Sequence, residues 1–216
     1  LPQLSQVKNN VDLQHLDKVY LEFNDLDALE IKETEKITNH DVKAVEYFVK
    51  KQLEKLGLSK YTEFVHFGLT SQDVNNTAIP LSLKEAMEAE IVPLLQEFIT
   101  KLRQKAVAWQ DVPMLAHTHG QPASPTRLGK EIEVFVERIE EQLRLLFNIP
   151  FAAKFGGATG NFNAHKIAYP NIDWKQFGTQ FVQQTLGLHH SFPTTQIEHY
   201  DHFAAFFDTL KRINTI

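Results

Sequence analysis

Four short polar segments interrupt a chain whose remaining sequence has mostly the apolar spacing of amphipathic helices. They are residues 38–41 (TNHD), 66–73 (HFGLTSQD), 117–123 (HTHGQPA) and 194–198 (TTQIE). Each contains hydroxyls, amides or imidazoles, and three lie just before a run with helical spacing, where free backbone N–H groups favour anions. This combination predicts an enzyme site that binds carboxylates.

The histidines of these segments are the residues best suited to move a proton. An imidazole with an ordinary pKa of about 6.5 donates or accepts a proton at neutral pH, and neighbouring hydroxyls and amides fix its tautomer. His117 and His119 could instead bind a metal, but no third histidine or carboxylate lies nearby in sequence. We favour proton transfer by one of the two. The alternative for any single residue is structural, such as a histidine packed beside a turn or a hydroxyl that caps a helix.

Composition excludes several functional classes. The 216 residues, 43% of them hydrophobic, are enough to bury a core. The net charge of −5, without a block of Lys and Arg, predicts that neither nucleic acid nor a membrane is a partner. The absence of cysteine excludes disulfides and thiolate metal sites, and no apolar run approaches the roughly 18 residues of a membrane helix. We therefore expect a cytoplasmic protein.

Long helices must position the polar segments. Apolar spacing predicts a helix over residues 39–57, with Asn39 as N-cap and Gly57 at its end, and a longer one over 71–110, which Pro80 and Pro93 should kink or divide. It predicts three further helices: 124–147 with Ser124 as N-cap, 173–186 with Asp173 as cap, and one from about residue 195 onward. No segment shows the alternation of a strand for more than a few residues. The prediction is an all-α fold, a bundle of long helices whose apolar stripes extend beyond what one chain covers, so that chains associate.

Four motifs together resemble the adenylosuccinate lyases of the fumarase/aspartase superfamily. They are TNHDV at 38–42, TSQD at 70–73, THGQPA at 118–123 and GNFNAH at 160–165. The THGQPA form resembles this branch more than the THLQ or TQLQ types of fumarases, argininosuccinate lyases and aspartases. The resemblance covers nearly the whole chain. It implies a homotetramer with active sites shared among three subunits, acting without a metal or an organic cofactor.

The resemblance also implies a reaction and the residues that perform it. The reaction is a carbon–nitrogen β-elimination of purine nucleotide biosynthesis, which releases fumarate from adenylosuccinate to give AMP and from SAICAR, the succinylated aminoimidazole carboxamide ribotide, to give AICAR. His119 is implied to be the general acid that protonates the leaving nitrogen. The implied substrate-binding residues are His40, Asp41, His66, Thr70, Ser71, Gln72, Thr118 and Gln196. Neutral donors suit such a site, because charge spreads into a carboxylate during the elimination.

One family feature is not found in these residues. The Ser-rich loop of the form SSxMPxKxNP, which would supply the base, does not occur, Leu1 is not a start methionine, and the last residues lie within a helical apolar pattern. We therefore expect a fragment in which residues 1–70 end an N-terminal helical domain, residues 71–216 form a truncated central bundle, and the C-terminal domain is absent. The alternatives are another fumarate-releasing lyase, of the argininosuccinate lyase or fumarase type, and a non-catalytic helical assembly module.

Overall fold

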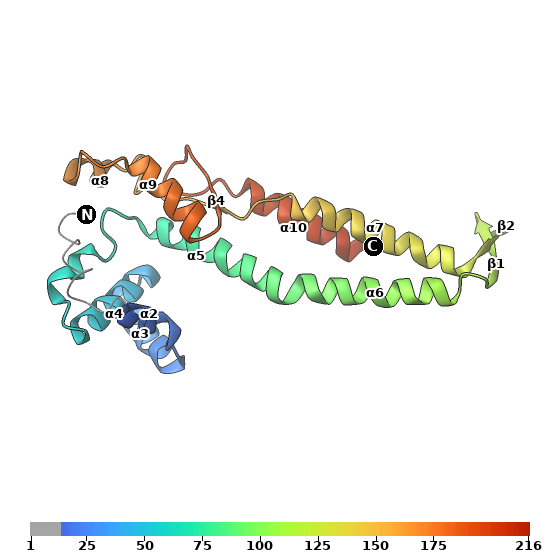
Figure 1. Ribbon diagram of the computed structural model, residues 1–216, viewed down its shortest axis with the longest axis horizontal. Helices are drawn as coiled ribbons and strands as arrows, with labels where there is room; N and C mark the ends of the chain where they lie inside the picture. The colour runs from blue at the N-terminus through green and yellow to red at the C-terminus, as the bar shows by residue number, and fades with distance from the viewer. Residues whose placement is uncertain (1–13) are drawn as a thin grey trace.

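The computed structural model describes residues 14–216, which fold into helices joined by two small sheets (Figure 1). The first part contains α2 (Gln14–Leu21), α3 (Asp25–Thr38), α4 (Asp41–Lys55) and the 3-10 turn η2 (Ser59–Phe64). The long part contains α5 (Ser71–Ala86), η3 (Met87–Ile91), α6 (Val92–Ala108), β1 (Pro113–Thr118), β2 (Gln121–Arg127) and α7 (Leu128–Phe147). The last part contains β3 (Ala152–Ala153), α8 (Asn163–Ala168), α9 (Trp174–Gln180), η4 (Phe181–Thr185), β4 (His189–His190) and α10 (Asp201–Thr215). The predicted all-α class is confirmed, while the first thirteen residues of the predicted N-terminal domain lie outside the described residues.

One continuous helical run, made of α5, η3 and α6, forms the axis of the molecule. Pro93 has no N–H to give to the carbonyl one turn earlier, so the regular ladder cannot pass through it. The chain instead makes a π turn at Met87–Ile91, where the N–H of Val92 donates to the carbonyl of Met87. The predicted join at Pro93 is therefore a π turn. At about 1.5 Å per residue, the run from Ser71 to Ala108 is about 55 Å long.

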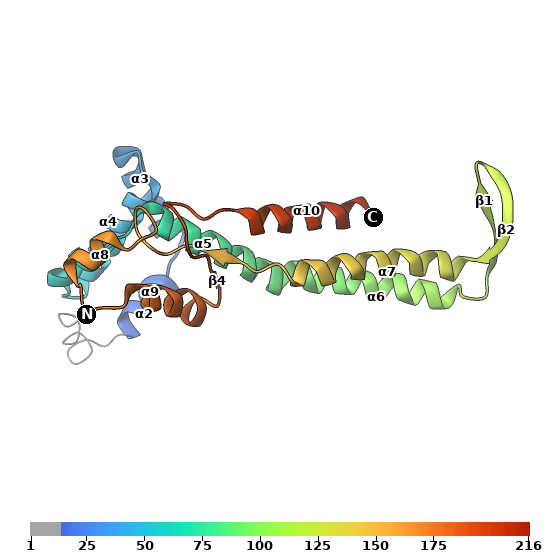
Figure 2. The same ribbon diagram turned by 90° about the horizontal axis from the view of Figure 1, so that it is seen from above.

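Two further helices pack along this axis. α7 returns beside α6, and α10 lies along α7 (Figures 1 and 2). Gly129 permits the close approach at the start of α7, because a Cβ there would collide with the carbonyl oxygen of Ala106. The shared core consists of Met87, Ile99, Val136, Ile139, Leu143, Leu146 and Phe206. The predicted side-by-side packing of the long helices is confirmed.

An antiparallel hairpin lies at the far end of the long helices, and the sequence did not predict it. Strands β1 and β2 pair from Pro113 opposite Arg127 to Thr118 opposite Gln121, so Ser124 lies within a strand and the prediction that it caps a helix was wrong. α7 begins only at Leu128. Most side chains of the hairpin are exposed on both faces. Such strands do not need the apolar alternation by which a half-buried strand is recognised.

The ends of the other helices differ in detail from the prediction. Asn39 is the left-handed C-cap of α3, and His40, not Asn39, caps α4. Gly57, at a φ of 75°, ends α4 as predicted, and Asp173 caps α9 by accepting the N–H of Gln176 at 3.0 Å. The last helix begins at Asp201, later than the predicted residue 195, because hydrogen bonds hold the preceding segment in another conformation.

A buried ion pair joins the start of α5 to the glycine-rich loop that follows β3. Nζ of Lys154 lies 2.8 Å from Oδ1 of Asp73, and both side chains are fully buried. Lys154 also donates to the carbonyl of Gly157 at 2.6 Å. Asp73 accepts the N–H groups of Gly156 at 2.8 Å and Gly157 at 3.0 Å. Every charge in this cluster is paired, which is the condition for keeping ions out of water.

We predict that Lys154→Met destabilises the fold strongly. The substitution preserves most of the side-chain volume but leaves Asp73 as a buried charge without its partner, at an expected cost of about 3–5 kcal/mol in the free energy of unfolding. The matched control is Lys130→Met, which breaks the exposed pair with Glu131 and should cost less than about 1 kcal/mol. Urea unfolding of both variants tests this prediction, and equal midpoints would contradict it.

Candidate active site

The predicted site residues lie in two groups at opposite ends of the long helices. Thr70, Ser71 and Gln72 lie at the start of α5, at the same end as α4. Thr118 and His119 lie in the hairpin beyond the end of α6 (Figures 1 and 2). The intervening helix is about 55 Å long. A single copy of the chain therefore does not bring the two groups together.

Two of the predicted residues contact each other at the start of α5. Nε2 of Gln196 donates to the hydroxyl of Thr70 at 3.3 Å, across 126 residues of sequence. Asp73 accepts the backbone N–H of Thr70 at 2.8 Å, which fixes the first turn of the helix. The free N–H groups of that turn and the hydroxyls beside them are uncharged hydrogen-bond donors, and the helix N-terminus gives them a partial positive charge. This surface is suited to a carboxylate.

His66 lies in the same region, beside a buried carboxylate. Nδ1 of His66 is 3.8 Å from Oε2 of Glu46, which is only 8% exposed. Burial alone would raise the pKa of the Glu46 carboxyl, but hydrogen bonds from Lys43 and Lys50 outweigh burial and hold that pKa below its usual range. Nε2 of His66 is buried and has no hydrogen-bond partner among the described residues. This nitrogen is the one free to meet a ligand.

His40 and Asp41 have structural roles at the start of α4. Nδ1 of His40 accepts the N–H of Lys43 at 3.2 Å, and Oδ1 of Asp41 accepts the N–H of Val42 at 2.7 Å. The cap assigns the proton of a neutral His40 to Nε2, which remains available as a donor. Capping and substrate binding are thus compatible at His40.

His119 is exposed at the tip of the hairpin. It and Gly120 are the two central residues of the turn, with φ values of 49° and 72°. A turn with positive φ at both positions is usually built from Asn-Gly or Gly-Gly. A histidine there is disfavoured by roughly 1 kcal/mol or more, and such strain is concentrated at functional positions. The turn therefore favours a chemical role for this imidazole.

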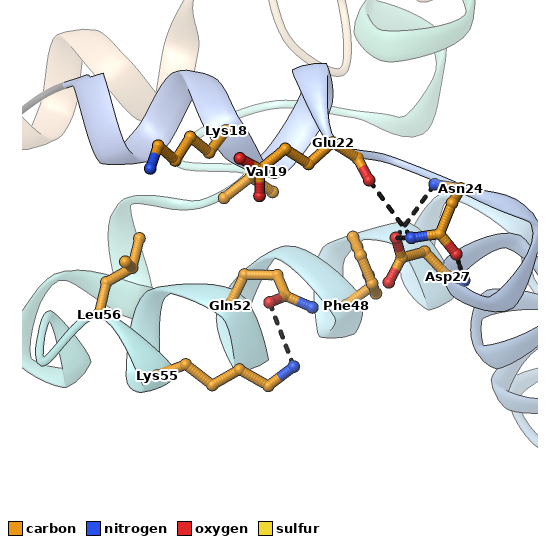
Figure 3. Close-up of a pocket in the computed structure, with 9 residues that line it drawn as sticks. All are labelled: Lys18, Val19, Glu22, Asn24, Asp27, Phe48, Gln52, Lys55 and Leu56. Atoms are coloured by element: carbon orange, nitrogen blue, oxygen red, sulfur yellow. Dashed lines mark hydrogen bonds between the residues drawn. The ribbon is translucent and has the colours of Figure 1, made fainter.

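Two hollows are not lined by the predicted site residues. One of about 460 Å³ lies between α2 and α4, and Figure 3 shows its polar side chains bonded to one another, Asn24 to Asp27 and Gln52 to Lys55. None of the predicted site residues lines it. An apolar cavity of about 400 Å³ is lined by aromatic rings and by the buried His165. Over residues 14–216, no group of three or more His, Asp or Glu side chains is placed to hold a metal ion.

Several supporting residues were not predicted from the sequence. Asp73, Asn76, Lys154 and Glu198 are all buried and polar. Lys154 did carry a signal, because it interrupts an apolar run that ends at a pair of glycines. The other three carry no such signal, and each takes part in a contact between segments more than 80 residues apart in sequence.

The sequence profile of a family described as Lyase matches residues 3–216. The chain belongs to this lyase family. A relative of Dictyostelium discoideum named "Adenylosuccinate lyase" is 53% identical over 100% of this chain and 47% of its own length. Relatives of the same name from Vibrio cholerae and Escherichia coli K12 are 46% and 44% identical, over 45% and 44% of their lengths. The predicted resemblance is confirmed, and the chain spans about half the length of these relatives.

Two solved structures, of a fumarate lyase and of a lactonizing enzyme, share the fold. A fumarate lyase from Mesorhizobium sp. BNC1 aligns with a TM-score of 0.74 over 98% of this chain and 48% of that chain, at 16% identity. The 3-carboxy-cis,cis-muconate lactonizing enzyme from Pseudomonas putida aligns with a TM-score of 0.67 over 88% of this chain and 42% of that chain, at 23% identity. At such identities the likeness concerns the fold alone. None of the helices between residues 14 and 216 combines the length and hydrophobicity needed to cross a bilayer.

The buried His165 and His190 predict how the stability of this lyase chain depends on pH. Burial lowers the pKa of His165, opposed in part by Asp73 and the carbonyl of Phe67, and burial lowers the pKa of His190 too. The unfolded state, with histidine pKa values of about 6.5, then binds more protons than the folded state below that pH. Stability is therefore complete above about pH 6.5 and declines as the pH falls below it.

His165→Leu should make this decline shallower, since one of the two buried imidazoles is gone. The measurement is the free energy of unfolding in urea at about pH 7.5 and about pH 5.5, compared between the variant and the parent. His117→Leu removes an exposed histidine and serves as the control. If the free energy of unfolding of His165→Leu falls between these two pH values by as much as that of the parent, the His165 ring does not contribute to the pH dependence.

Proposed function

We propose that this chain forms the carboxylate-binding and proton-donating parts of an adenylosuccinate lyase, which splits adenylosuccinate into fumarate and AMP. The observation that carries the proposal is the contact of Gln196 with Thr70 at the start of α5, because it gathers neutral donors at a helix N-terminus. Relatives named adenylosuccinate lyase match along the whole chain and support the same reading. We extend the proposal to SAICAR as a second substrate and to a cytoplasmic location.

The proposed chemistry follows from the donor types. Removal of the proton beta to the nitrogen leaves negative charge spread into a carboxylate, and fixed neutral donors stabilise that charge without adding a competing proton. Thr70, Ser71 and Gln196 take this role in the proposal, with Gln72 and Thr118 contacting the same substrate. His119 gives its proton to the departing nitrogen. His40, Asp41 and His66 are assigned to the nucleotide side.

The proposal requires more than one copy of the chain, because His119 lies far from Thr70 within a copy. A second copy packed antiparallel along the long helices would bring its hairpin to the start of α5. The long helices expose enough apolar surface for such packing: Ile79, Leu94, Phe98, Val107, Val134, Phe135, Leu145, Phe147 and Phe207. We propose a homo-oligomer, a tetramer as the resemblance implies, with residues 71–216 as its central bundle.

We predict that His119→Gln lowers kcat for adenylosuccinate by roughly 10²–10⁴ in the full-length protein, the usual range for a lost general acid. Glutamine preserves hydrogen bonding but cannot transfer the proton, so KM should change little. AMP formation measured at saturating substrate tests this. His117→Gln, two residues before His119 and within β1, is the control and should remain near the parent. A normal kcat in His119→Gln would assign the acid to another residue, with His66 and His40 next.

A comparison of substrates tests the proposed specificity. Turnover of adenylosuccinate should exceed that of argininosuccinate and of malate by orders of magnitude. Preference for either of these would indicate another fumarate-releasing lyase, and no turnover of any would favour a non-catalytic helical assembly.

A further inference from the structure

Asn76 is a buried residue for which the proposed chemistry has no use. It lies on α5 and is 2% exposed. Its Oδ1 accepts the backbone N–H of Glu198 at 2.9 Å, and its Nδ2 donates to the hydroxyl of Tyr200 at 2.7 Å. One amide side chain thus holds two points of a segment more than 120 residues away in sequence.

The segment that Asn76 holds is the one that carries Gln196. Glu198, 3% exposed, closes this segment on itself, because its carboxylate accepts the hydroxyl of Ser191 at 2.6 Å and the N–H of Tyr200 at 2.5 Å. On the opposite side the glycine-rich loop packs against it so closely that a Cβ on Gly160 would collide with the carbonyl oxygen of Thr194. The internal hydrogen bonds of Glu198 therefore fix the conformation of this segment, and its contacts with neighbouring elements fix its position.

Three hydrogen bonds tie this segment to the start of α5, and they differ in strength. The contact between Thr70 and Gln196 is exposed and 3.3 Å long. Water competes with such a contact, and a bound carboxylate would replace it. The contacts of Asn76 are shorter. The one with the N–H of Glu198 is buried and the one with the hydroxyl of Tyr200 is partly buried, so breaking them leaves polar groups that water reaches less readily. These two contacts are therefore the stronger tie between the segment and α5.

We propose that Asn76 is a positioning residue, which holds Gln196 against the start of α5 at the distance needed to share one substrate carboxylate with Thr70. The inference rests on the proposed function. The amide is suited to the task because it offers a donor and an acceptor at once. Aspartate would keep the acceptor but would place a second carboxylate beside the buried Glu198.

A double-mutant cycle tests whether Asn76 acts through Gln196. The variants are Asn76→Ala, Gln196→Ala and both together in the full-length protein, with kcat/KM for adenylosuccinate as the measured quantity. We expect Asn76→Ala to lower kcat/KM by about tenfold or more, and to change it by less than about twofold when Gln196 is already alanine. Independent, multiplicative effects of the two substitutions would contradict the inference while leaving the proposed function intact.

Two further variants separate positioning from general loss of stability. Thr209→Val removes a polar group that is 1% exposed in α10, away from the segment, and should lower the melting temperature without lowering kcat/KM. Tyr200→Phe removes only the contact to the Asn76 donor and should give a smaller loss than Asn76→Ala, which keeps the test available if the alanine variant does not fold.

Hydrogen exchange provides a readout that does not depend on activity. Asn76→Ala should speed exchange of the backbone amides of residues 194–197, and Thr209→Val should not. Unchanged exchange in this segment would overturn the positioning role. If the variant shows faster exchange but the full-length parent turns over no adenylosuccinate, the positioning of the segment by Asn76 is supported and the proposed function is rejected. Full activity of Gln196→Ala would remove Gln196 from the site and overturn the inference with it.

Discussion

The length of the helical run from α5 to α6 is the constraint on which the rest of the molecule depends. A rigid rod of about 55 Å places the hairpin at one end and the start of α5 at the other, so groups on the two ends cannot meet within one copy. The same rod exposes apolar side chains such as Leu94 and Phe98 that α7 and α10 do not cover. The length of this rod therefore both separates the proposed site residues and leaves apolar surface that the proposed second copy would cover.

At the end proposed to bind a carboxylate, buried polar contacts add to the apolar packing of Phe155, Phe162 and Trp174. The pair of Asp73 with Lys154 joins α5 to the glycine-rich loop, and Asn76 joins α5 to the segment that carries Gln196. These contacts are directional and leave no buried partner unpaired. They can therefore hold these two loops against α5 in one arrangement where a purely apolar surface would permit several. The hairpin end is built differently, since its shape comes from a tight turn at His119 and Gly120.

Sequence reasoning predicted the elements whose signals are local. Neighbouring residues alone indicate the helical stripes, the join near Pro93, the end of α4 at Gly57 and the cap at Asp173. All of these features are present. It missed the hairpin, because strands exposed on both faces need no alternation and His119-Gly120 is an unusual turn pair. It missed Asn76 because both partners of its side chain are distant in sequence, and it gave no role to Glu198, whose carboxylate bonds the nearby Ser191 and Tyr200. The motif resemblance implied the site residues and a site shared among subunits, and the structure adds that Thr70 and His119 lie at opposite ends of the long helices in one chain.

Complementation between two inactive variants tests most directly whether the site combines opposite ends of different copies. The full-length His119→Gln and Gln196→Ala proteins would be unfolded, mixed in equal amounts and refolded together, and AMP formation from adenylosuccinate would then be measured. If each site takes one end from each of two copies, roughly a quarter of the sites in random assemblies receive two intact ends. The activity of the mixture then rises far above that of either variant alone. Activity equal to the mean of the two separately refolded variants would show that each site is built within one copy, and would contradict the account.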